Sequence, residues 1–313
     1  NGPGMTIFSP DGRYGYVCSS FSPETVVIDT GTKKIVGSMK QDSPFCPDIA
    51  ATPDGAQVWL TLKDIGKTMV FNAKPPFQSL KVLDTGPITN HVNIVRNGKE
   101  QFAYVTVGGL NLIKVFRTDG FEQVASIPVG ALPHGLWPSG DGTRVYVGLE
   151  NADAAAVIDT ASNKVIETIP LGQAPQGVAY VPNAVTKGDG MANLQPLSAA
   201  AGSTQLSLAS ADGKGATQVT LFNQGLVQML QAAVTGLEPK QPYVLALAAS
   251  ATGDGVVQPL AAFMSNPAGA AIVNAVGPIR QVVSEVAAIQ RRYLVIVEGM
   301  ADKPGKPVQI QKP

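Results

Sequence analysis

The sequence is poor in the residues that most often carry chemistry. It contains only two histidines and two cysteines in 313 residues. The patterns Cys-x-x-Cys, Cys-x-x-Cys-His and His-Glu-x-x-His are absent, which excludes the common zinc-protease and covalent-haem motifs. A complete phosphate-binding loop and a nucleophile elbow are missing as well. The sequence therefore predicts no cofactor and no metal centre, and it shows no hydrolytic machinery.

Charge of either sign and long apolar runs are also scarce. Lys and Arg together number 23, Asp and Glu together number 23, and charged residues make up 15% of the chain. With a net charge of zero there is no electrostatic argument for nucleic acid as the main partner. No apolar run approaches the roughly 18 residues that a membrane-spanning helix needs. We therefore expect neither nucleic-acid binding nor a membrane span, and we leave oligomerisation open.

Turn residues, by contrast, are abundant and recur at a fixed interval. The chain has 33 glycines and 24 prolines, and Asp-Gly or Asn-Gly pairs begin at residues 11, 54, 97 and 141, which are 43, 43 and 44 residues apart. Short apolar runs between the turns carry no 3.6-residue stripe, so the repeat predicts four-stranded β-sheet units rather than helical repeats. Five residues after the start of each turn stands an aromatic residue: Tyr16, Trp59, Phe102 and Tyr146.

The first strand of each repeat is short, small and apolar, as an innermost strand around a central channel should be. Only four of the five candidates for it are followed by the rest of a repeat, and the last one stands alone. The candidates are residues 5–9, 48–52, 91–95, 134–137 and 177–181.

Two segments, SPDGRYGYVCSS…TVVIDTGTKKIVGSM and GDGTRVYVGLENADAAAVIDTASNKVIETIPLG, resemble the YVTN-type β-propeller repeat family over residues 1–182. The resemblance implies consecutive propeller blades, often seven, in a protein that is usually exported, so we expect a periplasmic or extracellular location. The isolated strand at 177–181 favours the hypothesis that the chain is the C-terminal part of a precursor whose further blades complete a seven-bladed ring. A complete ring of four or five blades is the alternative.

The composition changes after residue 182. Residues 183–202 are rich in Gly, Ala, Ser and Asn without a period, which is typical of a linker. Residues 203–313 contain short, often alternating apolar runs between turn residues, and they predict an antiparallel β-sandwich. One segment, GLVQMLQAAVTGL, fits both the strand and the helix period in part.

Four polar residues stand where the first strand of a repeat begins: Asp48, His91, His134 and Gln176. In a propeller these positions lie on one face around the channel mouth, where convergent polar side chains bind a small ligand or a protein partner. His91 and His134 come from adjacent repeats, so they also form a candidate pair for a shared metal. The alternative is that each histidine caps its turn or binds a loop carbonyl.

The two cysteines lie in neighbouring repeats. Cys18 ends a second strand, and Cys46 precedes the next first strand, 28 residues later. Both ends belong to the same face, so a disulfide is expected in an oxidising compartment. Two separate buried thiols and a functional thiol are the alternatives.

Two classes of function follow from these observations. The first is a non-catalytic, exported binding or scaffold protein that uses a propeller face to dock a small ligand or a protein partner. The second is a propeller enzyme, similar to lactonases or to quinoprotein oxidoreductases, whose catalytic residues lie in blades outside this sequence. The small number of mouth carboxylates and histidines favours the first class.

Overall fold

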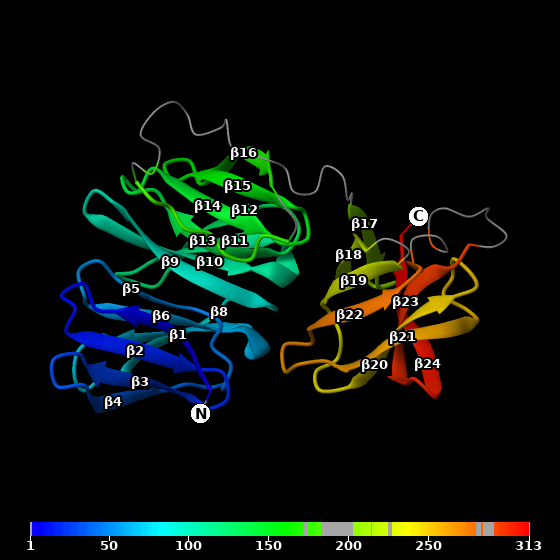
Figure 1. Cartoon of the computed structure of the whole chain (residues 1–313), viewed down its shortest axis with the longest axis horizontal. Helices are drawn as coiled ribbons and strands as arrows, with labels where there is room; N and C mark the ends of the chain where they lie inside the picture. Colours follow the sequence, from blue (N-terminus) through cyan, green and yellow to red (C-terminus); the bar gives the residue numbers. More distant parts are fainter. Residues whose placement is uncertain are drawn as a thin grey trace. The chain divides into compact units, whose positions relative to one another are not determined.

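The computed structural model describes residues 2–171, 174–182, 184, 203–213, 215–224, 227–279, 283 and 291–312. The chain separates into two compact units: residues 1–150 with 154–195, and residues 151–153 with 196–313. The fold is all-β, with four four-stranded sheets and one eight-stranded sheet (Figure 1). Within the described residues, no helix has the length and apolar character that crossing a membrane requires.

The repeat region, which we define as β1 to β16, consists of four antiparallel sheets that follow one another along the chain. Each sheet takes its four strands in sequence order, as the period of 43 predicts. Sheet 1 contains β1 (Pro3–Phe8), β2 (Tyr14–Ser19), β3 (Glu24–Asp29) and β4 (Lys34–Lys40), and sheet 2 contains β5 (Ile49–Ala51), β6 (Gln57–Leu62), β7 (Lys67–Asn72) and β8 (Ser79–Asp84). Sheet 3 contains β9 (Thr89–Asn97), β10 (Glu100–Val107), β11 (Leu112–Arg117) and β12 (Gln123–Pro128), and sheet 4 contains β13 (Pro133–Pro138), β14 (Arg144–Leu149), β15 (Ala154–Asp159) and β16 (Lys164–Pro170).

The sheets of the repeat region hold together through separate apolar interfaces. One cluster joins sheets 1 and 2 and includes Tyr16, Leu60 and Phe71. A second cluster joins sheets 2 and 3 around Trp59, which is fully buried and donates its indole N–H to the Gln57 side chain at 2.9 Å. Because Leu60 and Trp59 alternate along β6 and point to opposite sides, sheet 2 packs on sheet 1 through one face and on sheet 3 through the other.

The aromatic position of the third repeat differs from the sequence prediction. Tyr104, and not Phe102, pairs with Val115 in the register in which Trp59 pairs with Val70. Tyr104 is also fully buried. The hairpin from β9 to β10 is longer than its counterparts, so the residue that fills the interface stands two positions later along the chain.

The fifth predicted first strand is not a strand. Residues 174–182 carry no sheet assignment, because no strand of the described chain pairs with them. They lie against sheet 4: the Gly135 amide donates to the Gln176 carbonyl at 2.8 Å, and the Tyr180 ring stacks on Tyr146. A side chain at position 135 would collide with that carbonyl, so glycine permits the close approach.

The C-terminal sheet, which we define as β17 to β24, is one continuous antiparallel sheet. Its edge strands β21 and β22 contact each other, so the sheet is nearly closed and resembles a barrel. The two separate sheets expected for a sandwich are therefore not shown. Its strands follow the order β21 (Val256–Met264), β20 (Pro242–Ala248), β23 (Tyr293–Met300), β24 (Lys303–Gln311), β17 (Ser203–Ala209), β18 (Ala216–Gln224), β19 (Val227–Val234) and β22 (Ala271–Gly277).

The ambiguous segment GLVQMLQAAVTGL contributes β19, which pairs with β18 and β22 on its two sides. Its first two residues lie outside the described part of the chain. The segment forms a strand because residues two positions apart, Leu230 and Ala232, both point into the enclosed core. The predicted linker, residues 183–202, lies outside the described residues except for residue 184.

Candidate functional site

Three of the predicted site residues occupy repeat-equivalent positions. His91 follows Asp48 by 43 residues, and His134 follows His91 by 43 (91 − 48 and 134 − 91). Asp48 directly precedes β5, and the two histidines lie near the beginnings of β9 and β13. Because the sheets are consecutive copies of one unit, the repeat brings these three side chains to neighbouring places.

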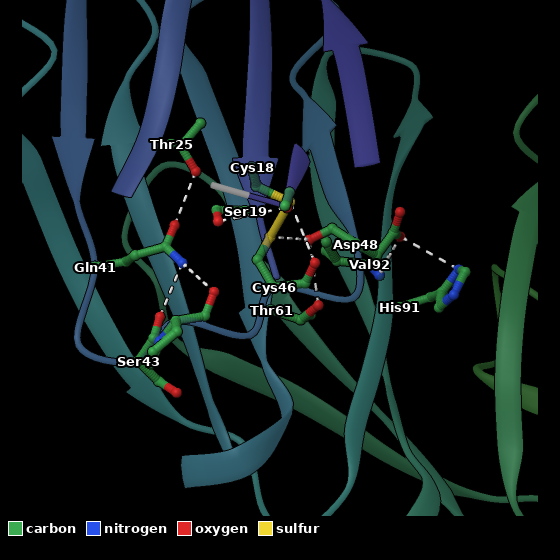
Figure 2. The surroundings of a disulfide bond; sticks show 12 residues. Cys18, Ser19, Thr25, Gln41, Ser43, Cys46, Asp48, Thr61, His91 and Val92 are labelled. Carbon is green, nitrogen blue, oxygen red and sulfur yellow. Dashed lines mark hydrogen bonds and ion pairs between the residues drawn. A yellow bond between two sulfur atoms is a disulfide. The ribbon is translucent and has the colours of Figure 1, made fainter. Parts of the chain in front are cut away.

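The three side chains lie in one row. The Nδ1 atom of His91 lies 3.5 Å from Oδ2 of Asp48, and Figure 2 shows the imidazole beside this carboxylate. The His91 and His134 rings meet edge to face with their centroids 5.0 Å apart. The fourth predicted residue, Gln176, joins the row through a carboxylate that the sequence analysis did not identify.

That carboxylate is Glu150, which follows β14. One of its oxygens lies 2.7 Å from Nδ1 of His134, and the other accepts a 2.8 Å hydrogen bond from the Gln176 amide. Lys63 contributes a favourable charge interaction to Glu150. Lys63 and Glu150 stand four residues after Trp59 and Tyr146, so aligning the repeats on these aromatic residues would have found both.

Buried hydrogen bonds between neighbouring sheets hold the row in place. The Thr106 hydroxyl accepts from the His91 amide and donates to the His134 carbonyl, both at 2.7 Å. The Thr61 hydroxyl donates to the Asn90 carbonyl at 2.5 Å, and the Asn90 side-chain amide donates to the Pro133 carbonyl at 2.9 Å. Because these groups are buried and paired, they fix the backbone that carries the histidines.

The charges of the row follow from its burial. Burial raises the pKa of Asp48 to about 7, although hydrogen bonds from the Val92 and Ile49 amides favour the carboxylate. Burial also lowers the pKa of His91 to about 3, and the neighbouring His134 and Lys63 add to the effect. At neutral pH His91 is therefore uncharged, and Asp48 lies close to its midpoint of titration.

Glu150 behaves differently from Asp48. Burial raises its pKa, but the hydrogen bond from His134 and the nearby positive charge outweigh this effect and leave the pKa below its usual range. Glu150 is thus a stable anion at neutral pH, oriented by His134 and Gln176. Burial lowers the pKa of Lys63, while the Glu150 charge opposes that shift.

A cavity of about 290 Å³ opens beside the row. The first strands of all four sheets contribute to its wall, together with residues 177–178. Asp48 and His91 supply its titratable groups, and Trp137 and Met5 add apolar surface. The arrangement combines a mostly apolar wall with a few convergent polar groups, which is typical of small-molecule sites.

The cysteines are joined by a disulfide, and no free cysteine is present in the chain. Their Cα atoms are 6.0 Å apart and both residues are buried. The bond connects the end of β2 in sheet 1 to the segment before β5 in sheet 2, close to Asp48 (Figure 2). The structure therefore has the expected disulfide, and neither two separate buried thiols nor a functional thiol.

The histidine pair gains no third metal ligand in the structure. Among the described residues, no three His, Cys, Asp or Glu side chains gather closely enough to hold a metal ion. Each histidine instead faces a carboxylate through its Nδ1 atom.

Comparisons with known proteins bear on the fold alone. No family model matches the sequence, and no curated protein matches it either. The solved structure of Kuenenia stuttgartiensis hydrazine synthase is similar at 18% identity and a TM-score of 0.52, over 96% of this chain and 77% of that one. A functionally unknown protein from Desulfotomaculum acetoxidans matches at 14% identity and a TM-score of 0.49, over 97% and 84%.

Proposed function

We propose that the protein is a binding protein that takes a small polar ligand at the row formed by Asp48, His91, His134, Glu150 and Gln176. The observation that carries the proposal is the convergence of repeat-equivalent polar residues beside one cavity. A buried hydrogen-bond network holds these residues, and burying polar groups costs stability unless they are paired or used.

We also propose that the four sheets are consecutive blades of a β-propeller similar to the YVTN type. Three observations support this: the sheets follow sequence order, they pack on their neighbours, and their first strands share one cavity. The disulfide supports an exported protein, since such bonds persist in oxidising compartments such as the periplasm.

The test is a thermal-shift screen of small polar metabolites, followed by calorimetry of each hit on variants. In His91→Ala/His134→Ala we expect affinity to fall at least tenfold, because His91 lines the cavity and the His134 ring lies directly against His91. We expect the fold to be retained, because neither side chain belongs to the apolar clusters that join sheets 1, 2 and 3. The control is Glu298→Ala, which changes a pocket of about 440 Å³ in the C-terminal sheet. Undiminished binding in the double variant, with loss in the control, would overturn the proposal.

An enzyme is the second candidate, and one observation favours it. The His134–Glu150 pair at 2.7 Å, steadied by Gln176, has the geometry of a histidine base oriented by a carboxylate. The chemistry would be that of a lactonase or of an oxidoreductase. A panel of lactones and alcohols tests it: turnover that disappears in His134→Ala but survives in Glu298→Ala would favour the enzyme over the binding protein.

A further inference from the structure

Asp48 is a carboxylate without a cationic partner. Its oxygens receive the Val92 and Ile49 amides, and His91 lies 3.5 Å away. Within the described part of the chain, no lysine or arginine forms an ion pair with it. Its side chain is only 13% exposed, so water supplies little compensation. A buried carboxylate is normally paired with a cation or else neutral.

The neighbouring groups do not supply the missing charge. His91 faces Asp48 but stays uncharged at neutral pH because it is buried. His134 lies 2.7 Å from Glu150, and Lys63 interacts favourably with the Glu150 charge. The Lys63 charge is therefore offset by Glu150, and Asp48 remains the carboxylate of the cavity wall without a cationic partner among the described residues.

The rest of the wall is apolar and partly aromatic. Trp137 and Met5 are each 42% exposed and line the same cavity, together with Ile7. Large apolar side chains are usually covered, so their exposure inside a cavity indicates a surface for an apolar group. An indole face also attracts organic cations.

We infer that the cavity takes a small organic ammonium ion, whose N–H group meets the Asp48 carboxylate and whose apolar part lies against Trp137. The inference rests on the proposed function, since it uses the same cavity. The cavity volume of about 290 Å³ suits a compact monoamine rather than a polymer. Binding the cation favours the ionised form of Asp48, so a proton leaves Asp48 where that group is protonated in the free protein.

Three aromatic probes of similar size and different charge test the inference: benzylamine, benzyl alcohol and benzoate, each titrated into the full chain at pH 7.5. We expect benzylammonium to bind at least tenfold more tightly than the alcohol, and benzoate not to bind. Asp48→Asn should remove the preference for the amine, because the amide keeps the shape and one acceptor oxygen but loses the charge. Trp137→Ala should weaken the binding of the amine and of the alcohol to the same extent.

The pH dependence adds a second readout. Affinity for benzylammonium should rise at least fivefold from pH 6 to pH 8 in the wild type and stay level in Asp48→Asn. Equal binding of amine and alcohol, or binding of benzoate, would overturn the inference while leaving the proposed function intact. If no probe binds, and the screening hits bind His91→Ala/His134→Ala as tightly as the wild type, both proposals fail together.

Discussion

The two β regions of this protein bury their polar groups in different ways. In the repeat region, buried hydroxyls such as those of Thr61 and Thr106 bind the backbone of the neighbouring sheet. In the C-terminal sheet, the buried Gln309 side chain accepts from Thr217 and donates to the Thr235 carbonyl, all within one sheet. Buried polar groups thus link neighbouring sheets in the first region and segments of one sheet in the second.

The cores differ in the same sense. The repeat region contains separate clusters between sheets, whereas the C-terminal sheet has one large cluster drawn from most of its strands and a smaller one on β20 and β23. Repetition brings one residue of each unit to the same place, which is how three positions 43 residues apart form a row. A sheet without a repeat offers no such convergence. The difference shows why the candidate site lies in the repeat region.

The largest expected effect tests whether the cores act separately. Trp59→Ala should cost about 3–5 kcal/mol, because it removes a fully buried indole from the interface of sheets 2 and 3. Hydrogen exchange should quicken mainly in those sheets, as expected for nearest-neighbour packing. Leu230→Ala, in the large core cluster of the C-terminal sheet, should speed up hydrogen exchange in strands all around that sheet. Faster hydrogen exchange in every sheet of the repeat region of Trp59→Ala would contradict the idea that the clusters between sheets act separately.

The disulfide gives the next effect. Cys18→Ser/Cys46→Ser should lower the free energy of unfolding of sheets 1 and 2 by about 3–4 kcal/mol, since the bond closes a loop of 28 residues. Because both cysteines lie in the repeat region, a reducing agent should leave exchange in the C-terminal sheet unchanged. Limited proteolysis with and without reductant checks the result. Equal loss of protection in both regions would contradict it.

The pH dependence of stability tests the electrostatic effect of burying Asp48 in the repeat region. The pKa of Asp48 is about 7 in the folded state and 3.8 ordinarily, so the folded protein binds this proton more tightly. Wild-type stability should therefore fall from pH 4 to pH 8 relative to Asp48→Asn, by roughly 3–4 kcal/mol. His91, with its pKa lowered to about 3, contributes the opposite slope below pH 6.5. Urea unfolding of the wild type and of Asp48→Asn at each pH isolates the contribution of Asp48. If the free energies of unfolding of the two proteins change in parallel with pH, that contribution is excluded.

The smallest effect compares two buried threonines. Thr106→Val and Thr217→Val should each cost about 1–2 kcal/mol, because each leaves a buried polar group without its partner. Only Thr106→Val should also weaken ligand binding, since it releases the backbone of His91 and His134. Calorimetry with a hit from the screen separates the two variants. A matching loss of affinity in Thr217→Val would remove the distinction between the regions.

Part of the site could be predicted from sequence because it follows the period. Asp48, His91 and His134 were recognisable as equivalent positions, and the pairing of Cys18 with Cys46 followed from strand ends on one face. Glu150 was missed because it follows a second strand rather than preceding a first one. Its position becomes visible only when Tyr146 is aligned with Trp59.

The sequence by itself determined the strand content, the number of consecutive sheets and the equivalence of positions, because turn residues and alternating apolar residues act locally. Only the tertiary structure decided which groups meet. Tyr104 replaced Phe102 because a longer hairpin shifts the register, and residues 177–181 formed no strand because pairing needs a partner. The eight C-terminal strands joined into one sheet, and Asp48 acquired its raised pKa, because closure and burial depend on neighbours far apart in the chain.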